Sequence, residues 1–179
     1  NLFAHTLPQM GIEVRFADAR QPESFAALID ERTKAIFCES IGNPLGNITD
    51  FAKLADIAHA HGIPLIVDHT VPSPYLCRPF EPGGGTVGPS LTKYLGGHSD
   101  ALVVAVIARR ERIDRLLQTG VIHFGGFLSP FNAWPVLRRP ATLLLTLTCH
   151  PTRTLDVARF LCALPLSTRL VPLRFPLLP

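Results

Sequence analysis

The sequence predicts an α/β fold in which a mostly parallel sheet carries helices on both faces. Three observations lead to this class. Short apolar runs alternate with longer segments of helical periodicity through the first hundred residues. The apolar runs at 34–40 and 63–70 are nearly continuous, as in strands that are covered on both faces. Hydrophobic residues make up 47% of the 179 residues, which is enough for a sizeable core.

Two strands and a helix are predicted within the first forty residues. Ile12–Asp18 alternates apolar and polar residues, which is typical of a strand. Residues 21–32 place apolar side chains at helical spacing, with Pro22 in the first turn, and therefore predict a helix. The run KAIFCES (34–40) is short and apolar, which predicts a buried strand.

The middle of the chain predicts a second helix and a further strand. Residues 49–62 form the helix, with Thr49 as its cap and Gly62 as its C-terminal stop. The run IPLIVDHT (63–70) predicts the next buried strand. The predicted inner face of the helix consists of Phe51, Leu54, Ala55 and Ala58.

The pattern continues past residue 100 and then changes. Ala101–Ala108 is an apolar run that predicts a third buried strand, and residues 109–120 predict a helix. Residues 131–164 are apolar enough for a long helix. An internal proline costs about 3 kcal/mol of helix stability, so Pro135 and Pro140 predict a kink or a break.

Charge and composition narrow the range of partners. The net charge is +3, with an excess of acid before residue 100 and an excess of arginine after it. These arginines are dispersed and lack interleaved aromatic residues, so we expect solvated helix faces and no nucleic acid. No apolar stretch is long enough to cross a bilayer, and we expect no membrane partner. The four cysteines are widely spaced, which favours reduced thiols in the cytoplasm over disulfides or a metal site.

Lys93 stands between two hydroxyl residues and a glycine pair in SLTKYLGGHSD (90–100), and it is one of only three lysines. A lysine amine forms a Schiff base with an aldehyde cofactor, and the hydroxyls of Ser90 and Thr92 suit a phosphate on that cofactor. Asp68 suits a pyridinium nitrogen, and Asn43 suits a phenolic oxygen. Taken singly, each residue has an ordinary alternative, such as a solvated lysine or an aspartate that caps a turn.

The segments ESIGNP, LIVDHTVPSPYL and SLTKYLGGHSD together resemble a known family in order and spacing. It is the Cys/Met-metabolism family of pyridoxal-phosphate enzymes, which includes cystathionine γ-synthase and lyase, methionine γ-lyase, and the O-acetyl- and O-succinylhomoserine sulfhydrylases. The resemblance runs from Asn1 to about Leu161. It implies the large domain of a fold-type-I pyridoxal-phosphate transferase, truncated at both ends.

The resemblance also implies roles for the five candidate residues, with pyridoxal 5'-phosphate as the cofactor. Lys93 would be the Schiff-base and catalytic lysine, and Asp68 would pair with the ring nitrogen. Ser90 and Thr92 would bind the phosphate, while Asn43 would face the phenolic oxygen. No metal is implied.

The implied activity is γ-replacement, as in sulfhydrylation of an O-acyl-homoserine, or γ-elimination on a small amino-acid substrate in methionine and cysteine metabolism. A homodimer or homotetramer is the implied assembly. The chain begins at Asn1 without a methionine, so a truncated, non-catalytic remnant is the alternative. The expected divisions are a partial cofactor-binding domain (1–130), an interdomain helix kinked by prolines (131–164) and a proline-rich tail of uncertain order (165–179).

Two departures from the family pattern lie beside the candidate residues. His69 follows Asp68 where the family has asparagine. A histidine there either titrates near its ordinary pKa and perturbs the ring contact, or points away from it. Pro89 precedes Ser90 and removes a backbone N–H beside the expected phosphate site.

Overall fold

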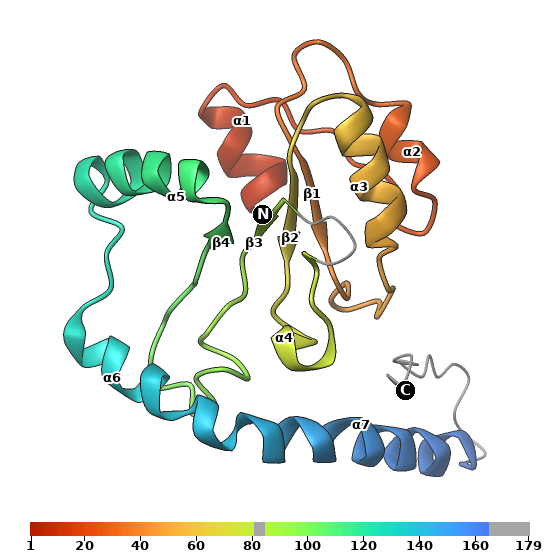
Figure 1. Cartoon of the computed structure of the whole chain (residues 1–179). Coiled ribbons are helices and arrows are strands. Elements are labelled where there is room, and N and C mark those ends of the chain that lie inside the picture. The colour runs from red at the N-terminus through yellow and green to blue at the C-terminus, as the bar shows by residue number, and fades with distance from the viewer. Residues whose placement is uncertain (81–84, 165–179) are drawn as a thin grey trace.

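A computed structural model describes residues 1–80 and 85–164, and its centre is a four-stranded sheet (Figure 1). The spatial order of the strands equals their chain order. The first three strands run parallel and the last pairs antiparallel, so the sheet is mostly parallel as predicted. The strands are β1 (Ile36–Glu39), β2 (Leu65–Asp68), β3 (Thr86–Val87) and β4 (Ile107–Ala108).

The core lies between the sheet and helix α3 (Phe51–Ala60), on the right in Figure 1. Leu54 and Ala58 of α3 are fully buried against Leu65 and Val67 of β2, and the predicted inner face of this helix is confirmed. Burying a leucine of this kind contributes roughly 1.5–3 kcal/mol. This packing fixes the position of the β1 and β2 strand ends.

The ends of α3 differ from the prediction at one position. Asp50, and not Thr49, is the N-cap: its carboxylate accepts a hydrogen bond from the backbone N–H of Lys53 at 3.2 Å. The Thr49 hydroxyl is instead buried and donates to the carbonyl of Glu39 in β1. At the other end, Gly62 has φ +65°, a conformation that glycine adopts without strain, so the predicted stop is confirmed.

The opposite face of the sheet is covered by the N-terminal helical turns, a π-helical turn at Leu2–Thr6 and α1 (Leu7–Gln9). The ring of Phe3 packs on that of Phe37 in β1 with 4.6 Å between their centroids. Phe37 nevertheless keeps 38% of its surface exposed. Helices therefore lie on both faces, but the second face is thinly covered in the described part of the chain.

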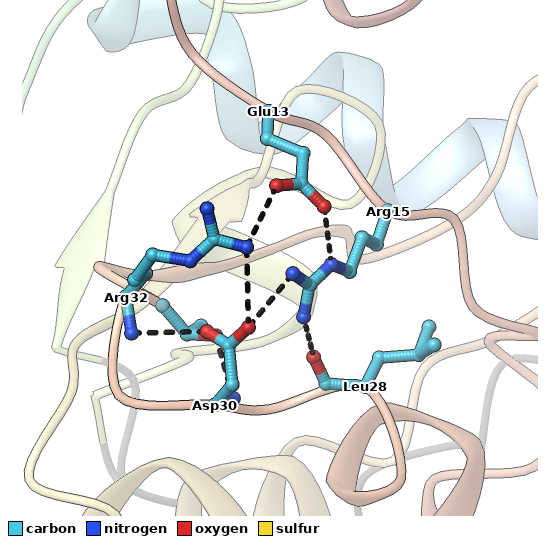
Figure 2. A network of polar contacts seen from close by, with 6 residues as sticks. Glu13, Arg15, Leu28, Asp30 and Arg32 are labelled. Atoms are coloured by element: carbon cyan, nitrogen blue, oxygen red, sulfur yellow. Dashed lines mark hydrogen bonds and ion pairs between the residues drawn. The ribbon is translucent and has the colours of Figure 1, made fainter.

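The predicted strand at Ile12–Asp18 is wrong, because this extended segment has no ladder partner among the described residues. Side chains hold it in place instead (Figure 2). Arg15 pairs with Glu13 and Asp30 at 2.7 Å each and donates to the carbonyl of Leu28 at 2.9 Å. The guanidinium of Arg15 lowers the pKa of Asp30 to about 2. Alternation thus indicated an extended backbone but not a place in the sheet.

The helix predicted for residues 21–32 is shorter in the structure. α2 spans Glu23–Ala26, and Pro22 is its N-cap residue. The backbone N–H of Asp30 bonds the Thr33 hydroxyl at 2.9 Å, and this local turn takes the backbone out of the helix before β1.

The predicted third strand, Ala101–Ala108, is mostly wrong. Only Ile107 and Ala108 form β4, while an isolated antiparallel bridge joins Val104 to Ser90. The backbone of Val103 is occupied by the 90–93 turn, since its carbonyl accepts from the N–H of Leu91 at 2.8 Å. The apolar run 101–108 therefore forms backbone contacts with the turn that carries Lys93 as well as with the sheet.

The remaining helices follow β4. The first of them lies beside β4 at the upper left of Figure 1, and the last crosses beneath the strand ends. The helix predicted at 109–120 is α5 (Arg110–Leu116), and a π-helical segment (Leu117–His123) continues it. The predicted break at Pro140 is confirmed, because α6 (Pro130–Arg138) ends before it and α7 (Pro140–Cys162) begins with it. Pro135 lies inside α6 without ending it.

Short α4 (Ser73–Leu76) follows β2 and contacts α7. None of the helices described for residues 1–80 and 85–164 has the length and apolar character needed to cross a bilayer. The predicted tail, 165–179, lies outside the described residues. The predicted division at residue 130 stays a prediction.

Candidate cofactor site

The candidate residues lie at the carboxyl edge of the parallel strands, where ligands bind in sheets of this kind. Asp68 is the last residue of β2, and its carbonyl accepts from the N–H of Ser40 beyond β1 at 2.9 Å. Asn43 lies in the turn after β1, where its backbone N–H donates to the Glu39 carboxylate at 2.9 Å. The two strand ends are thereby held together.

Thr70 connects three parts of the site. Its backbone N–H and its hydroxyl both donate to the Oδ1 atom of Asp68, the former at 3.0 Å. The same hydroxyl accepts from the backbone N–H of Ser90 at 2.9 Å. Asp68 and the turn that carries Lys93 are therefore linked through one side chain, and the Asp68 carboxylate has a fixed orientation.

Lys93 and Asn43 line one pocket of about 510 Å³, together with Thr70 and Val71. The chain turns sharply around Lys93, because the Gly97 N–H donates to the Lys93 carbonyl at 2.7 Å. Lys93 is exposed, so its amine is accessible to a small molecule. The other lining residues are Tyr94, Gly97, Ser99, Arg139, Thr146 and His150.

The two hydroxyls of the 90–93 turn differ in their hydrogen bonds. The Thr92 hydroxyl donates to the Val103 carbonyl at 3.3 Å and accepts from the Val103 N–H at 2.8 Å, so both of its roles are in use. The Ser90 hydroxyl has no hydrogen-bond partner among the described residues and is half-buried. Neither residue is among the lining residues of the Lys93 pocket. Ser90 is the better placed of the two to accept a new ligand.

His69 points away from the pocket. It is fully buried, its ring packs edge-on against Phe51, and its Nε2 lies 3.0 Å from the Ser73 carbonyl and 2.8 Å from that of Cys77. Both neighbours of Nε2 are acceptors, so Nε2 carries the proton and holds the loop around α4. Burial lowers the pKa of His69. The sequence left two alternatives for His69, which stands where the family has asparagine. The structure supports the one in which the His69 side chain points away from the contact between Asp68 and the cofactor ring.

Sequence reasoning missed the wall that α7 and the α6–α7 junction contribute. Tyr94 packs edge-on against His150 of α7 with 5.3 Å between ring centroids, which closes one side of the pocket. Arg139 and Thr146 belong to the same wall. The available signal was the i, i+4 and i+8 spacing of Thr142, Thr146 and His150, which places them on one helix face.

The chain belongs to the family of Cys/Met metabolism PLP-dependent enzymes, whose family model matches residues 1–179. It is 38% identical over 159 residues to an L-methionine gamma-lyase of Porphyromonas gingivalis, a match that covers 88% of this chain and 40% of that protein. It is 32% identical over 200 residues to an O-acetyl-L-homoserine sulfhydrylase of Leptospira meyeri, covering 90% and 45%. The chain thus spans less than half the length of these curated relatives.

Solved structures of similar proteins support the same family assignment. A protein from Campylobacter jejuni described as an O-acetylhomoserine (thiol)-lyase, with a pyridoxyl-lysine phosphate group, has a TM-score of 0.87 and 33% identity, covering 92% of this chain and 47% of that one. The cystathionine gamma-lyase of Lactobacillus plantarum, complexed with L-serine, has a TM-score of 0.88 and 32% identity, covering 94% and 44%. The predicted family, the fold-type-I class and the pyridoxal-phosphate cofactor are confirmed.

The residues of the pocket fit this cofactor on chemical grounds. A volume of about 510 Å³ lies within the usual range for small-molecule sites. The pocket offers an amine from Lys93, an amide from Asn43 and no carboxylate among its described lining residues, so a phosphate ester meets no like charge there. The Asp68 carboxylate lies one hydrogen bond behind Thr70.

Proposed function

We propose that this chain carries the Lys93 half of a pyridoxal-phosphate site that catalyses γ-replacement or γ-elimination on an amino-acid substrate. The single observation that carries the proposal is the pocket that Lys93 shares with Asn43 and Thr70, linked through Thr70 to Asp68. The cofactor, when bound, supplies an electron sink for the substrate carbanion. The proposal includes a homodimer or homotetramer, as the family resemblance implies, and a cytoplasmic location, which the widely spaced cysteines favour.

The chain's own residues divide the work as follows. The Lys93 amine would hold the cofactor aldehyde and would be the base that takes the proton from the substrate α-carbon. The Asp68 carboxylate, oriented by Thr70, would favour the protonated form of the ring nitrogen, because an adjacent anion favours the charged form of a base. Ser90 is assigned to the phosphate and Asn43 to the phenolic oxygen. Thr92 joins the phosphate site only if its hydroxyl exchanges the Val103 backbone for the ligand.

A second candidate function is a non-catalytic remnant of such an enzyme. One observation favours it: the Thr92 hydroxyl is fully engaged by Val103, so one of the two expected phosphate ligands is committed elsewhere. A chain of this kind retains the fold and the pocket, but it does not hold the cofactor tightly enough to convert the amino-acid substrate.

A product assay separates these functions. The purified chain with pyridoxal phosphate is given O-acetylhomoserine plus sulfide, and separately methionine. Replacement yields homocysteine and acetate, because sulfide bonds to the γ-carbon as acetate leaves. Elimination yields methanethiol, ammonia and 2-oxobutanoate, with water consumed. Lys93→Ala should abolish either product, whereas Lys53→Ala on the exposed side of α3 should not. No product from the unsubstituted chain supports the remnant.

A further inference from the structure

Arg139 is a half-buried cation at the junction of α6 and α7. Its side chain packs against Gly97 so closely that a Cβ atom at Gly97 would overlap the Arg139 Nε. Gly97 has φ +76°, so both the backbone conformation and the space require glycine. The turn that begins at Lys93 therefore ends on the guanidinium of Arg139.

The hydrogen bonds of Arg139 leave its charge unmatched. Nη1 donates to the Thr142 hydroxyl and Nη2 to the Thr146 hydroxyl, each at 3.0 Å. Both acceptors are neutral. Nε is buried and has no partner among the described residues. A guanidinium has five N–H donors and binds carboxylate or phosphate in a forked geometry, so this group retains donors for an oxyanion.

The pocket reinforces this charge. Arg139 and Lys93 are both lining residues, and no aspartate or glutamate is found among the described residues that form the wall. Two cations that face one space of about 510 Å³ repel each other and attract an anion. Thr142 and Thr146 limit the movement of the guanidinium and so preorganise it.

We propose that Arg139 binds an oxyanion in the Lys93 pocket, either the carboxylate of the amino-acid substrate or the phosphate of the cofactor. The inference rests on the proposed function for the identity of these ligands, but not for the existence of the anion site. Arg139 acts as a binding and positioning residue in the pocket that it shares with Lys93.

Nitrogen-15 NMR of the full chain tests this directly through the arginine Nε–Hε signals. Arg139→Lys assigns the Arg139 signal by its disappearance, and Arg138→Lys assigns that of its neighbour, which is exposed and stacks 4.8 Å from the Trp134 ring centroid. The chain is titrated with two matched pairs: methionine against methioninamide, and pyridoxal phosphate against pyridoxal. Inorganic phosphate serves as a fifth probe.

We expect the Arg139 signal to move with the oxyanion-bearing member of at least one pair and not with the other member. The pair that responds identifies the carboxylate or the phosphate as the source. Arg139→Gln should raise the dissociation constant of that ligand by about tenfold or more, the range for losing a charge-assisted hydrogen bond. Arg138→Gln, with the same change of charge, should leave it unchanged.

The inference is overturned if the Arg139 signal is silent to all five probes, moves equally with both members of each pair, or moves no more than that of Arg138. Lys93→Ala separates this result from the proposed function. A shift of Arg139 with phosphate in that variant supports the anion site even if Lys93 never reacts. If the Arg139 signal does not move in a chain whose Lys93 reacts with pyridoxal phosphate, the anion site at Arg139 is refuted but the proposed function is not.

Discussion

At the residue scale, the site depends on side chains that hold neighbouring residues in place by hydrogen bonds. Thr70 fixes the Asp68 carboxylate and joins it to the Ser90 backbone, a role that the sequence alone did not assign to it. His69, one residue away, has its ring on the other side of the strand and fastens the α4 loop. Side chains alternate across a strand, so Asp68 and Thr70 share one side while His69 faces the core.

The buried His69 predicts a pH dependence of stability. Burial lowers its pKa from 6.5, so below pH 6.5 the unfolded chain takes up a proton that the folded chain resists. The free energy of unfolding should therefore fall as the pH drops through 6.5 and stop falling below the folded pKa. Urea unfolding at a series of pH values measures it. His69→Asn should flatten the decline, and exposed His59→Asn should keep it; equal slopes in both variants would contradict the assignment.

The cysteines predict a second residue-scale result. Burial in β1 raises the pKa of Cys38 to about 12, so its thiol is protonated and shielded at neutral pH. Cys149 and Cys162 are exposed on α7. Because the thiolate is the reactive form, Ellman's reagent should label these two quickly and Cys38 only after unfolding. Peptide mapping after brief labelling checks this, and early label on Cys38 would show that β1 is not packed against α3.

At the element scale, the sequence predicted a helix or strand correctly where its hydrophobic pattern matches the surface on which it packs in the fold. The apolar face of α3 meets the sheet, and its predicted inner residues are buried. Ile12–Asp18 has an equally clear pattern, but a strand also needs a hydrogen-bonding partner strand, which a single segment does not encode. The run at 101–108 failed for a related reason: the turn at Lys93 uses the backbone of Val103.

The capping of α3 can be measured. Asp50→Ala removes the acceptor of the Lys53 N–H, so the free energy of unfolding should fall by about 1 kcal/mol. Asp56→Ala is the matched control, because Asp56 is exposed within the same helix. This substitution also replaces an aspartate by alanine, which is a better helix former. Chemical denaturation compares the two. A larger loss in Asp56→Ala would mean that the cap contributes little.

At the scale of the whole molecule, the site is formed by segments far apart in the chain. The β1 and β2 ends supply Asn43 and Thr70, and the 90–93 turn supplies Lys93. The three motifs predicted this meeting, because parallel strands end at one edge. The α7 wall was not predicted. The spacing of residues on its helix face does not show that the helix approaches the pocket, which depends on the packing of Arg139 against Gly97.

Large apolar side chains remain exposed on α6 and the segments beside it, among them Phe124, Phe131 and Leu137, each with more than three quarters of its surface in solvent. Exposed apolar surface of this extent is typical of a face that contacts other protein. This agrees with the proposed homo-oligomer.

Chemical trapping at Lys93 tests most directly whether this lysine binds pyridoxal phosphate. The chain is incubated with pyridoxal phosphate, reduced with borohydride, digested and mapped by mass spectrometry, beside Lys93→Ala. We expect one added pyridoxyl phosphate group per chain, located at Lys93, with neither Lys34 nor Lys53 labelled beyond trace. Label spread over the three lysines, or the same total label in Lys93→Ala, would show that Lys93 is not the cofactor-binding lysine.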